Sequence, residues 1–537
     1  MSASQQLTVP PFSLENLRGE DVSFPAAGAN RESLVVFVKE DCPTCREVMP
    51  VLAAMHDAFA GALDVHVVGQ TTAGNATLDA EFRPPFALLD DSTLKVSFAA
   101  DIDTVPSVFW ADTEGGTKRQ LIGFVREEWQ ALAASLSEAA GVDGPALSWD
   151  ELPEWRPGCG SLSVDPTIAD RLRAEAENSP LRARRIDIGT ADDEAEFMFD
   201  QGFTDGLPVV PPTPERVMRM LSGTQRDPQE VLGAMPPNMG EVTIEKVAIN
   251  AVLAGAKPEY MPVIATVAEA ILSEAYNIHG VMATTMGAAP VVVVNGPIRE
   301  KIGMNMKLGA LGQGNRANAT IGRAVRLLIR NVGGARPGGT ERSTLGSPLK
   351  FTMCFAEWEE RSMWEPLHVE RGFNESDSVV SVFTMSSGPT LIVDQDSRTA
   401  PQLAGTMGPS LEAIFNPKAH LATDTLLVVC PEHIDTFKAD NPNFSKADLR
   451  ARIQEVTARP LRDLVADEIS GTGIKPEMAA KMSEAQLDSL APKFRGDDQI
   501  NIVVAGSEAG KFSGAFHGWV TGEIGSISVS RKIEEFG

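Results

Sequence analysis

The stretch DCPTCREVMP, residues Asp41–Pro50, contains two cysteines in a CxxC arrangement directly after the apolar run Leu34–Val38. The residues that follow have a helical pattern, so Cys42 is predicted in the first turn of a helix and Cys45 one turn further on. A helix N-terminus carries unpaired N–H groups and a partial positive charge, and both stabilise a thiolate. Such a position lowers a thiol pKa from about 8.5 to roughly 3.5–7.5. We therefore predict that Cys42 is the reactive sulfur and that Cys45 closes a disulfide with it.

A zinc site is the alternative use of a CxxC pair. A structural zinc ion needs four ligands, which usually come as two such pairs. The chain contains no second CxxC. The sequence therefore favours redox chemistry at Cys42 and Cys45 over metal binding.

The composition limits the class of protein. The chain has 537 residues, of which 43% are hydrophobic and 22% charged, as in ordinary globular proteins, and its length predicts more than one domain. A formal net charge of −26 would repel a nucleic acid. The first thirty residues contain no apolar stretch typical of a signal peptide, and no segment offers the eighteen or more apolar residues of a membrane span. We expect a cytoplasmic protein with neither nucleic acid nor membrane as a partner.

The first 140 residues resemble the thioredoxin-like family. "PPFSLENLRGEDVSF" (Pro10–Phe24) is similar to the N-terminal hairpin of the lipid-anchored or peroxiredoxin-type branch. "DTVPSVFWAD" (Asp103–Asp112) resembles the loop and strand that hold the cis-proline, here Pro106, and "RQLIGFVREEWQALAASL" (Arg119–Leu136) the last strand and helix. The resemblance implies a cis peptide before Pro106, with the Val105 backbone free to pair with a substrate. The Pro-Thr dipeptide between the cysteines, in place of the commonest Gly-Pro, leaves the direction of electron flow open.

The rest of the chain predicts a second, larger α/β domain. Residues 141–158 are rich in glycine, proline and tryptophan without a clear period, and we interpret them as a linker between a domain at 1–140 and a domain at 159–537. Beyond them, apolar helices are predicted at Ile244–Ala254 and Val263–Ala275. Short β-branched strands are predicted at Pro290–Val294, Leu391–Val393, Leu426–Val429 and Ile500–Val504. Alternating strands and helices indicate an α/β layer architecture.

Cys159 is the third candidate redox residue. It lies in "RPGCGSLSVDP" (Arg156–Pro166), where flanking glycines leave the sulfur little steric cover, although a lone cysteine is more often inert packing. The passage resembles the motif of the UGSC (seleno)protein family, in which selenocysteine or cysteine is followed by Gly-Ser-Cys. Leu162 stands here where that family has its partner cysteine. We therefore expect the resolving thiol to come from the CxxC module. In this relay Cys159 attacks or is oxidised by a substrate, and Cys42 then attacks the adduct while Cys42–Cys45 closes.

Residues Gly287–Gly346 form a glycine-rich segment that could hold an anion. Glycines before a helix can present backbone N–H groups to a phosphate or carboxylate, and nearby arginines add positive charge. The spacing fits neither the phosphate-binding loop nor the dinucleotide fingerprint, and close packing of backbones explains the glycines equally well. The candidate residues for substrate or anion binding are Arg316, Arg323, Asn315, Asp205, His279 and His368. Arg326 adds further positive charge to the segment.

A metal site is a weaker hypothesis for "FTMCFAEWEERSMWEPLHVERGF" (Phe351–Phe373). Cys354, Glu365 and His368 offer ligands that zinc or iron accept, but Pro366 weakens the helix that would bring two of them together. An aromatic pocket wall is the other interpretation. No cofactor besides a redox-active disulfide is expected.

The sequence thus predicts an enzyme, a thiol-dependent oxidoreductase that acts on a small molecule in the large domain. An external thiol or a thioredoxin-type protein would supply electrons, and a homo-oligomer remains open. Two alternatives differ in class. A lyase or sulfur-transfer enzyme would use Cys159 without net reduction, and a non-enzymatic binding module would have its state set by the redox module.

Overall fold

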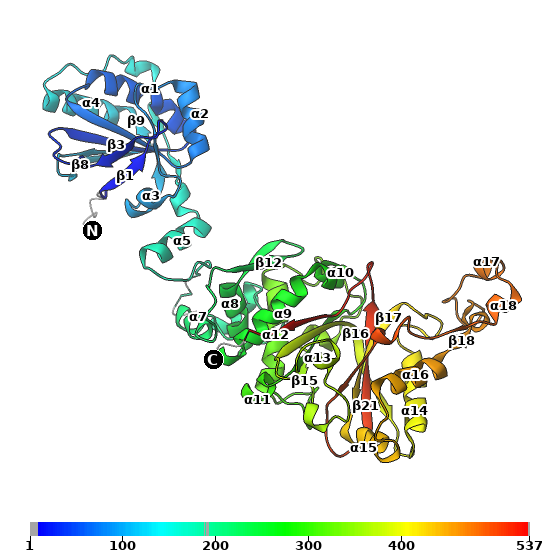
Figure 1. The fold of residues 1–537 in the computed structure, drawn as a ribbon. Coiled ribbons are helices and arrows are strands. Elements are labelled where there is room, and N and C mark those ends of the chain that lie inside the picture. Colours follow the sequence, from blue (N-terminus) through cyan, green and yellow to red (C-terminus); the bar gives the residue numbers. More distant parts are fainter. Residues whose placement is uncertain (1–8, 187, 190–192, 535–537) are drawn as a thin grey trace. The chain divides into compact units, whose positions relative to one another are not determined.

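The computed structural model describes residues 9–186, 188–189 and 193–534, and the chain divides into two compact units, Met1–Ile186 and Asp187–Gly537 (Figure 1). Each unit has its own sheet and its own hydrophobic core. Both units mix helices and strands, so the predicted α/β fold class is confirmed. Within the described ranges no helix combines the length and the apolar character needed to cross a bilayer.

The first unit is built on a five-stranded sheet in the order β5–β4–β3–β7–β8. The central strand β3 pairs parallel with β4 and antiparallel with β7. The run Leu34–Val38 in β3 is wholly buried, as expected of a strand covered on both faces. The strands are β3 (Glu32–Val38), β4 (Leu63–Gly69), β5 (Leu89–Asp90), β7 (Ser107–Ala111) and β8 (Thr117–Ile122).

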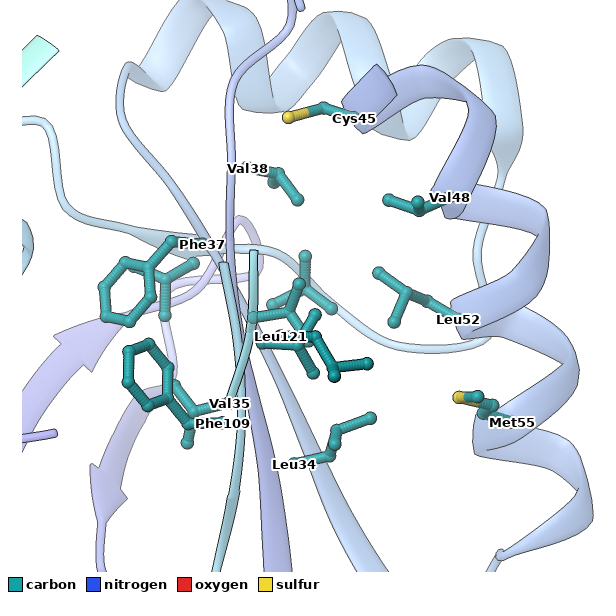
Figure 2. Close-up of a cluster of buried hydrophobic side chains, with 14 of the residues drawn as sticks. Leu34, Val35, Phe37, Val38, Cys45, Val48, Leu52, Met55, Phe109 and Leu121 are labelled. Carbon is teal, nitrogen blue, oxygen red and sulfur yellow. The ribbon is translucent and has the colours of Figure 1, made fainter. Parts of the chain in front are cut away.

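Helices cover this sheet, and α1 carries the CxxC. Val48, Leu52 and Met55 recur at helical spacing along α1, and Figure 2 shows them pointing toward Leu34 and Val38 of β3. All five side chains are buried, and each contributes roughly 1.5–3 kcal/mol by leaving water. This packing fixes the start of α1 beside the end of β3. The helices are α1 (Pro43–Ala58), α2 (Thr72–Phe82), α3 (Lys95–Ala99), α4 (Arg126–Ala140) and α5 (Pro166–Ala176).

Short strands complete the first unit. The predicted N-terminal hairpin is formed by β1 (Phe12–Glu15) and β2 (Asp21–Phe24), which pair antiparallel. β6 (Thr104–Val105) leads through a cis peptide at Pro106 into β7, as predicted. β9 (Phe124–Val125) links β8 to α4.

The structure differs from the predicted domain boundaries, because residues 141–186 belong to the first unit. Two two-residue strands return to it: β10 (Trp155–Arg156) pairs with β9, and β11 (Cys159–Gly160) pairs with β6. Trp149 packs on the core, whereas Trp155 is 62% exposed. Strands this short have no hydrophobic period, so the sequence pattern indicated a linker where the backbone pairs.

The second unit contains a mixed seven-stranded sheet in the order β15–β14–β16–β21–β17–β20, with β22 also paired to β16. β14 and β17 pair parallel with the edge strands β15 and β20, and the inner pairs are antiparallel. The predicted strand at Ile500–Val504 is β20, with the same bounds. The sheet strands are β14 (Ala289–Asn295), β15 (Cys354–Ala356), β16 (Val379–Val393), β17 (Thr423–Val429), β20 (Ile500–Val504), β21 (Phe512–Val520) and β22 (Val529–Lys532).

Two groups of helices pack against this sheet. Apolar residues of α14 (Ala400–Glu412), α15 (Pro431–Asp440) and α16 (Lys446–Thr457) share one core with β17 and β20, and Figure 1 shows the three helices in yellow and orange beside these strands. A second group contains α8 (Ile244–Ala254), which has the predicted bounds, α9 (Met261–Leu272) and α12 (Arg316–Asn331). The glycine-rich segment Gly287–Gly346 therefore contains a long helix, α12.

The remaining elements are short. They are α6 (Glu194–Asp200), α7 (Pro214–Leu221), β12 (Val231–Met235), β13 (Gly240–Thr243), α10 (Ile278–Ala283), α11 (Ile298–Lys301), α13 (Leu367–Glu370), β18 (Arg459–Pro460), α17 (Pro476–Ala479), α18 (Glu484–Leu487) and β19 (Leu490–Ala491).

Candidate active site

The two CxxC cysteines lie where β3 passes into α1. Cys42 is the N-cap of α1 and Pro43 its first residue, a position where the missing proline N–H has no partner to lose. The backbone N–H of Cys45 donates to Cys42 Sγ at 3.3 Å, and the N–H of Lys39 donates to Cys45 Sγ at 3.4 Å. Both sulfurs are fully buried and are free thiols in this structure.

The electrostatic surroundings of the two sulfurs differ. A hydrogen bond from the Cys45 thiol is the largest influence on Cys42, and with further hydrogen bonds from Cys159 and the start of α1 it lowers the pKa of Cys42 to about 5, although burial opposes this. Burial, followed by the interaction with Cys42, raises the pKa of Cys45 far above its ordinary value. At neutral pH the site therefore holds a Cys42 thiolate beside a Cys45 thiol.

Cys159 lies against Cys42 within the first unit. β11 pairs antiparallel with β6 so that Cys159 is opposite Val105 and Gly160 opposite Thr104. Cys42 Sγ lies 3.4 Å from the Val105 carbonyl oxygen and is hydrogen-bonded to the Cys159 thiol. Burial and the adjacent Cys42 raise the pKa of Cys159 to about 11. Cys42 is thus the middle sulfur of three, with Cys45 and Cys159 as its two neighbours.

This arrangement changes two expectations from the sequence. Cys159 was placed in the large domain at 159–537, but its strand is part of the first unit. The Val105 backbone was expected to be free for a substrate, but the chain's own β11 pairs with it. Both differences arise because the chain after α4 folds back over the cis-proline loop.

Side-chain hydrogen bonds hold the returning segment, residues 155–162, in place on either side of Cys159. On one side, the Thr44 hydroxyl donates to the Pro157 carbonyl oxygen at 2.6 Å. On the other, Lys39 Nζ donates to the Gly160 carbonyl oxygen at 3.0 Å. Because these bonds lie within two residues of Cys159, they fix the backbone that presents its sulfur to Cys42.

Gln70, directly after β4, is a functional residue that the sequence analysis missed. Its amide donates to Ser161 Oγ at 2.6 Å and accepts from the Leu162 N–H at 3.0 Å. The side chain is 1% exposed, so these partners satisfy an amide that would otherwise be costly to bury. A lone glutamine after a strand gives no sequence signal. The N–H of Leu162 thus helps to anchor the segment.

The Cys42 thiolate should be visible as a pH titration of the ultraviolet absorbance of the reduced protein. We expect a transition with a midpoint near pH 5 that is absent from Cys42→Ser and displaced upward in Cys159→Ala, which loses one hydrogen bond to the thiolate. Because the pKa is lower in the folded state, this group stabilises the fold above its ordinary pKa, and the contribution is lost as the pH falls through about 5. A midpoint near pH 8.5, the value of a free thiol, would contradict this assignment.

The candidate arginines and the asparagine of the second unit bind the protein's own groups. Arg323 forms a bidentate ion pair with Asp205, at 2.9 and 2.7 Å, and also donates to two carbonyl oxygens of the loop that follows Asp205. Arg316 Nε donates to the Gly255 carbonyl oxygen at 2.8 Å, and Asn315 is the N-cap of α12. The structure brings Arg323 and Asp205 together, and their ion pair connects α12 to the loop that contains Asp205.

The candidate histidines and metal ligands belong to the second unit, whereas the three thiols belong to the first. His279 is exposed on α10, whereas His368 is fully buried, with Nε2 3.4 Å from the Glu375 carbonyl oxygen. Cys354 is buried in β15, while Glu365 is exposed. A CxxH sequence is also present at Cys430–His433, at the start of α15. Among the residues that the structure describes, no three His, Cys, Asp or Glu side chains form a group that could hold a metal ion.

The topology of the first unit and the CxxC at the start of α1 define it as thioredoxin-like. No protein-family model matches the chain, and no curated protein matches it in sequence. Solved structures that match include a putative thiol:disulfide interchange protein DsbE from Chlorobium tepidum (21% identity, 25% of this chain, 96% of that chain, TM-score 0.24). Others are StoA from Bacillus subtilis (20%, 23%, 99%, 0.21) and a putative thioredoxin from Neisseria meningitidis (22%, 25%, 91%, 0.22). The resemblance of residues 159–537 to the UGSC family stays a prediction, and the motif that suggested it lies in the first unit.

Proposed function

We propose that the protein is a thiol–disulfide oxidoreductase whose first unit uses three cysteines, with Cys159 meeting a small-molecule substrate and Cys42 with Cys45 supplying two electrons. The observation that carries this proposal is the position of Cys42 beside both other cysteines: the Cys45 N–H donates to Cys42 Sγ, and Cys42 Sγ lies 3.4 Å from the carbonyl oxygen of Val105, the residue paired with Cys159. Cys159 is the only one of the three that is partly exposed, and Cys42 is the one that is ionised. The sulfur that a substrate can reach is therefore Cys159, and the sulfur that is the better nucleophile is its neighbour Cys42.

The steps can be written for a small disulfide, R–S–S–R′. The Cys159 thiol attacks one sulfur while its proton passes along the hydrogen bond to the Cys42 thiolate and on to the leaving R′S⁻, which departs as a thiol. The Cys42 thiolate then attacks Cys159 Sγ, which releases RS⁻ and forms a Cys42–Cys159 disulfide. Cys45 next attacks Cys42, so the Cys42–Cys45 disulfide closes, and its proton leaves Cys159 as a thiol. An external dithiol reduces Cys42–Cys45 and restores the starting state.

The positions and burial of the three cysteines support this order, in which the Cys42–Cys159 disulfide forms before the Cys42–Cys45 disulfide. A disulfide between Cys42 and Cys159 needs only a local adjustment, because the strands that carry Val105 and Cys159 are already in register. Cys45 lies one turn inside α1 with its thiol toward Cys42. Burial, followed by the interaction with the Cys42 thiolate, raises the pKa of Cys45, so Cys45 stays protonated while Cys42 carries its negative charge. The resolving step therefore follows formation of the mixed disulfide.

The test is to trap the mixed disulfide in the full chain. In Cys45→Ser, treated with one equivalent of a small aromatic disulfide, we expect a Cys42–Cys159 disulfide to accumulate and to appear as a cross-linked peptide in mass spectrometry. The matched control is Cys45→Ser with Cys159→Ser, which should instead keep the aromatic thiol on Cys42 or react slowly. Recovery of Cys45→Ser without the cross-link, under conditions that oxidise the parent, would contradict the proposal.

Consumption of the reductant separates reduction from sulfur transfer. If the parent reduces its substrate, one equivalent of dithiothreitol is oxidised for each disulfide cleaved. Transfer of a sulfur adduct from Cys159 to an acceptor would consume no dithiothreitol.

A further inference from the structure

The second unit contains a cavity of about 800 Å³ between α12 and the loop that follows it, within the size range of small-molecule sites. One wall comes from α12, where Arg326 and Arg330 are four residues apart and therefore share a face. The loop adds Glu341, Arg342 and Lys350 to the lining. Four cations thus surround the cavity in a chain whose net charge is −26.

The two carboxylates that line the cavity are fewer than these four cations, and each of them already has a basic partner. Glu341 binds Lys350 Nζ at 2.7 Å, and its nearest approach to Arg326 is 4.0 Å. The other carboxylate of the lining, Asp205, is held by the bidentate bond to Arg323. Neither acid is left to pair with Arg330.

Arg326 is buried and Arg330 is half-buried with a buried Nε, so polar groups without partners are costly at both residues. Arg326 is 8% exposed, and its hydrogen-bond acceptors are the Lys350 carbonyl oxygen at 3.0 Å and the weakly accepting Met282 sulfur. Arg330 Nε is buried, and no residue that the structure describes accepts a hydrogen bond from it. Burial lowers the pKa of both guanidinium groups. An anion in the cavity would supply acceptors to the guanidinium groups that line it.

Exposed apolar side chains complete the lining. Leu345 is 98% exposed and Phe351 is 42% exposed, and both lie on the loop side of the cavity. A bare inorganic ion would leave these side chains without contact, whereas an organic molecule could cover them. Guanidinium groups bind planar carboxylates and phosphates in a bidentate fashion.

We propose that this cavity binds a small organic anion, with a dianionic phosphate or dicarboxylate group against Arg326, Arg330 and Lys350 and an apolar body along Leu345 and Phe351. The site is separate from the three thiols and does not depend on the proposed redox function. It also differs from the anion site that the sequence suggested around Arg316 and Arg323, because those two arginines bind protein groups.

The experiment is calorimetric titration of the full chain with phenyl phosphate and with phthalate, and with benzyl alcohol as an uncharged control. We expect at least one of the two anions to bind at millimolar concentration or below and benzyl alcohol not to bind. Arg330→Met should weaken that binding about tenfold or more, since it removes charge-assisted hydrogen bonds. The matched control is Arg316→Met, on the same helix but outside the lining, which should bind as the parent does. The anion that binds more tightly shows whether the cavity prefers a phosphate or a dicarboxylate head group.

Two results would overturn the site: neither anion binds the parent, or Arg330→Met binds as tightly as the parent. If circular dichroism shows that Arg330→Met is unfolded, Arg342→Ser replaces it, because Arg342 is an exposed residue of the lining. That variant should bind the anion severalfold more weakly than the parent, and unchanged binding would count against the site. The thiol trap in Cys45→Ser should be unaffected by either arginine variant, so a failure here leaves the redox proposal standing.

Discussion

Replacing Cys159 with serine should slow turnover of a small disulfide or of hydrogen peroxide by about a hundredfold or more, with dithiothreitol as the reductant. The reason is access: Cys42, the ionised sulfur, is fully buried under the returning segment, whereas Cys159 is partly exposed. Serine keeps the size of the side chain but is a much weaker nucleophile. The measurement is the steady-state rate of substrate loss at neutral pH, compared with the parent chain.

Two further variants make the comparison specific. Cys42→Ser should lose turnover on the order of a thousandfold or more, since it removes the sulfur through which both disulfides form. Cys430→Ala, a buried cysteine of the second unit, should turn over like the parent. A Cys159→Ser protein as fast as the parent on both substrates would show that the CxxC pair acts without a third thiol.

Local chemistry allowed much of the first unit to be predicted. Cys42 is the N-cap of α1 and Pro106 follows a cis peptide, as the resemblance implied, because each depends on a few adjacent residues. The strand at Ile500–Val504 and the helix at Ile244–Ala254 were predicted with their bounds, since both are predominantly apolar segments. Where the hydrophobic period was strong, the sequence pattern was sufficient to predict the element and its bounds.

Features that depend on tertiary pairing could not be predicted in this way. The predicted strand Leu391–Val393 is the end of the fifteen-residue β16, whose exposed middle lacks the apolar signal. The site of Cys159 depends on a two-residue bridge to Val105 and on the amide of Gln70, which lies ninety-one residues before Ser161. Arg326 and Arg330 of the cavity share α12 with Arg323, but only the fold decides which of these arginines meets a carboxylate.

The Gly158→Ala substitution should release the returning segment and open the first unit to polypeptide substrates. A Cβ at Gly158 would lie 2.2 Å from Thr104 Cγ2 and 2.8 Å from the Val105 carbonyl oxygen, so the backbone of residues 157–160 must move away from β6. We expect the rate of reduction of a protein disulfide, such as that of insulin, to rise about tenfold. An unpaired β6 can accept an extended peptide beside the Cys42 thiolate, as in other forms of strand addition.

Gly160, in β11 and two residues after Gly158, provides the control. A Cβ at Gly160 meets no atom within 4 Å, so Gly160→Ala should leave β11 in place and keep the parental rate. Because strain of this kind costs about 1–3 kcal/mol, Gly158→Ala should fold while its segment undocks. The same displacement separates Cys159 from Cys42, so the cross-link trapped in Cys45→Ser should decrease when Gly158→Ala is added. If both glycine variants reduce insulin at the parental rate, the returning segment does not exclude protein substrates, and the restriction to small molecules must have another cause.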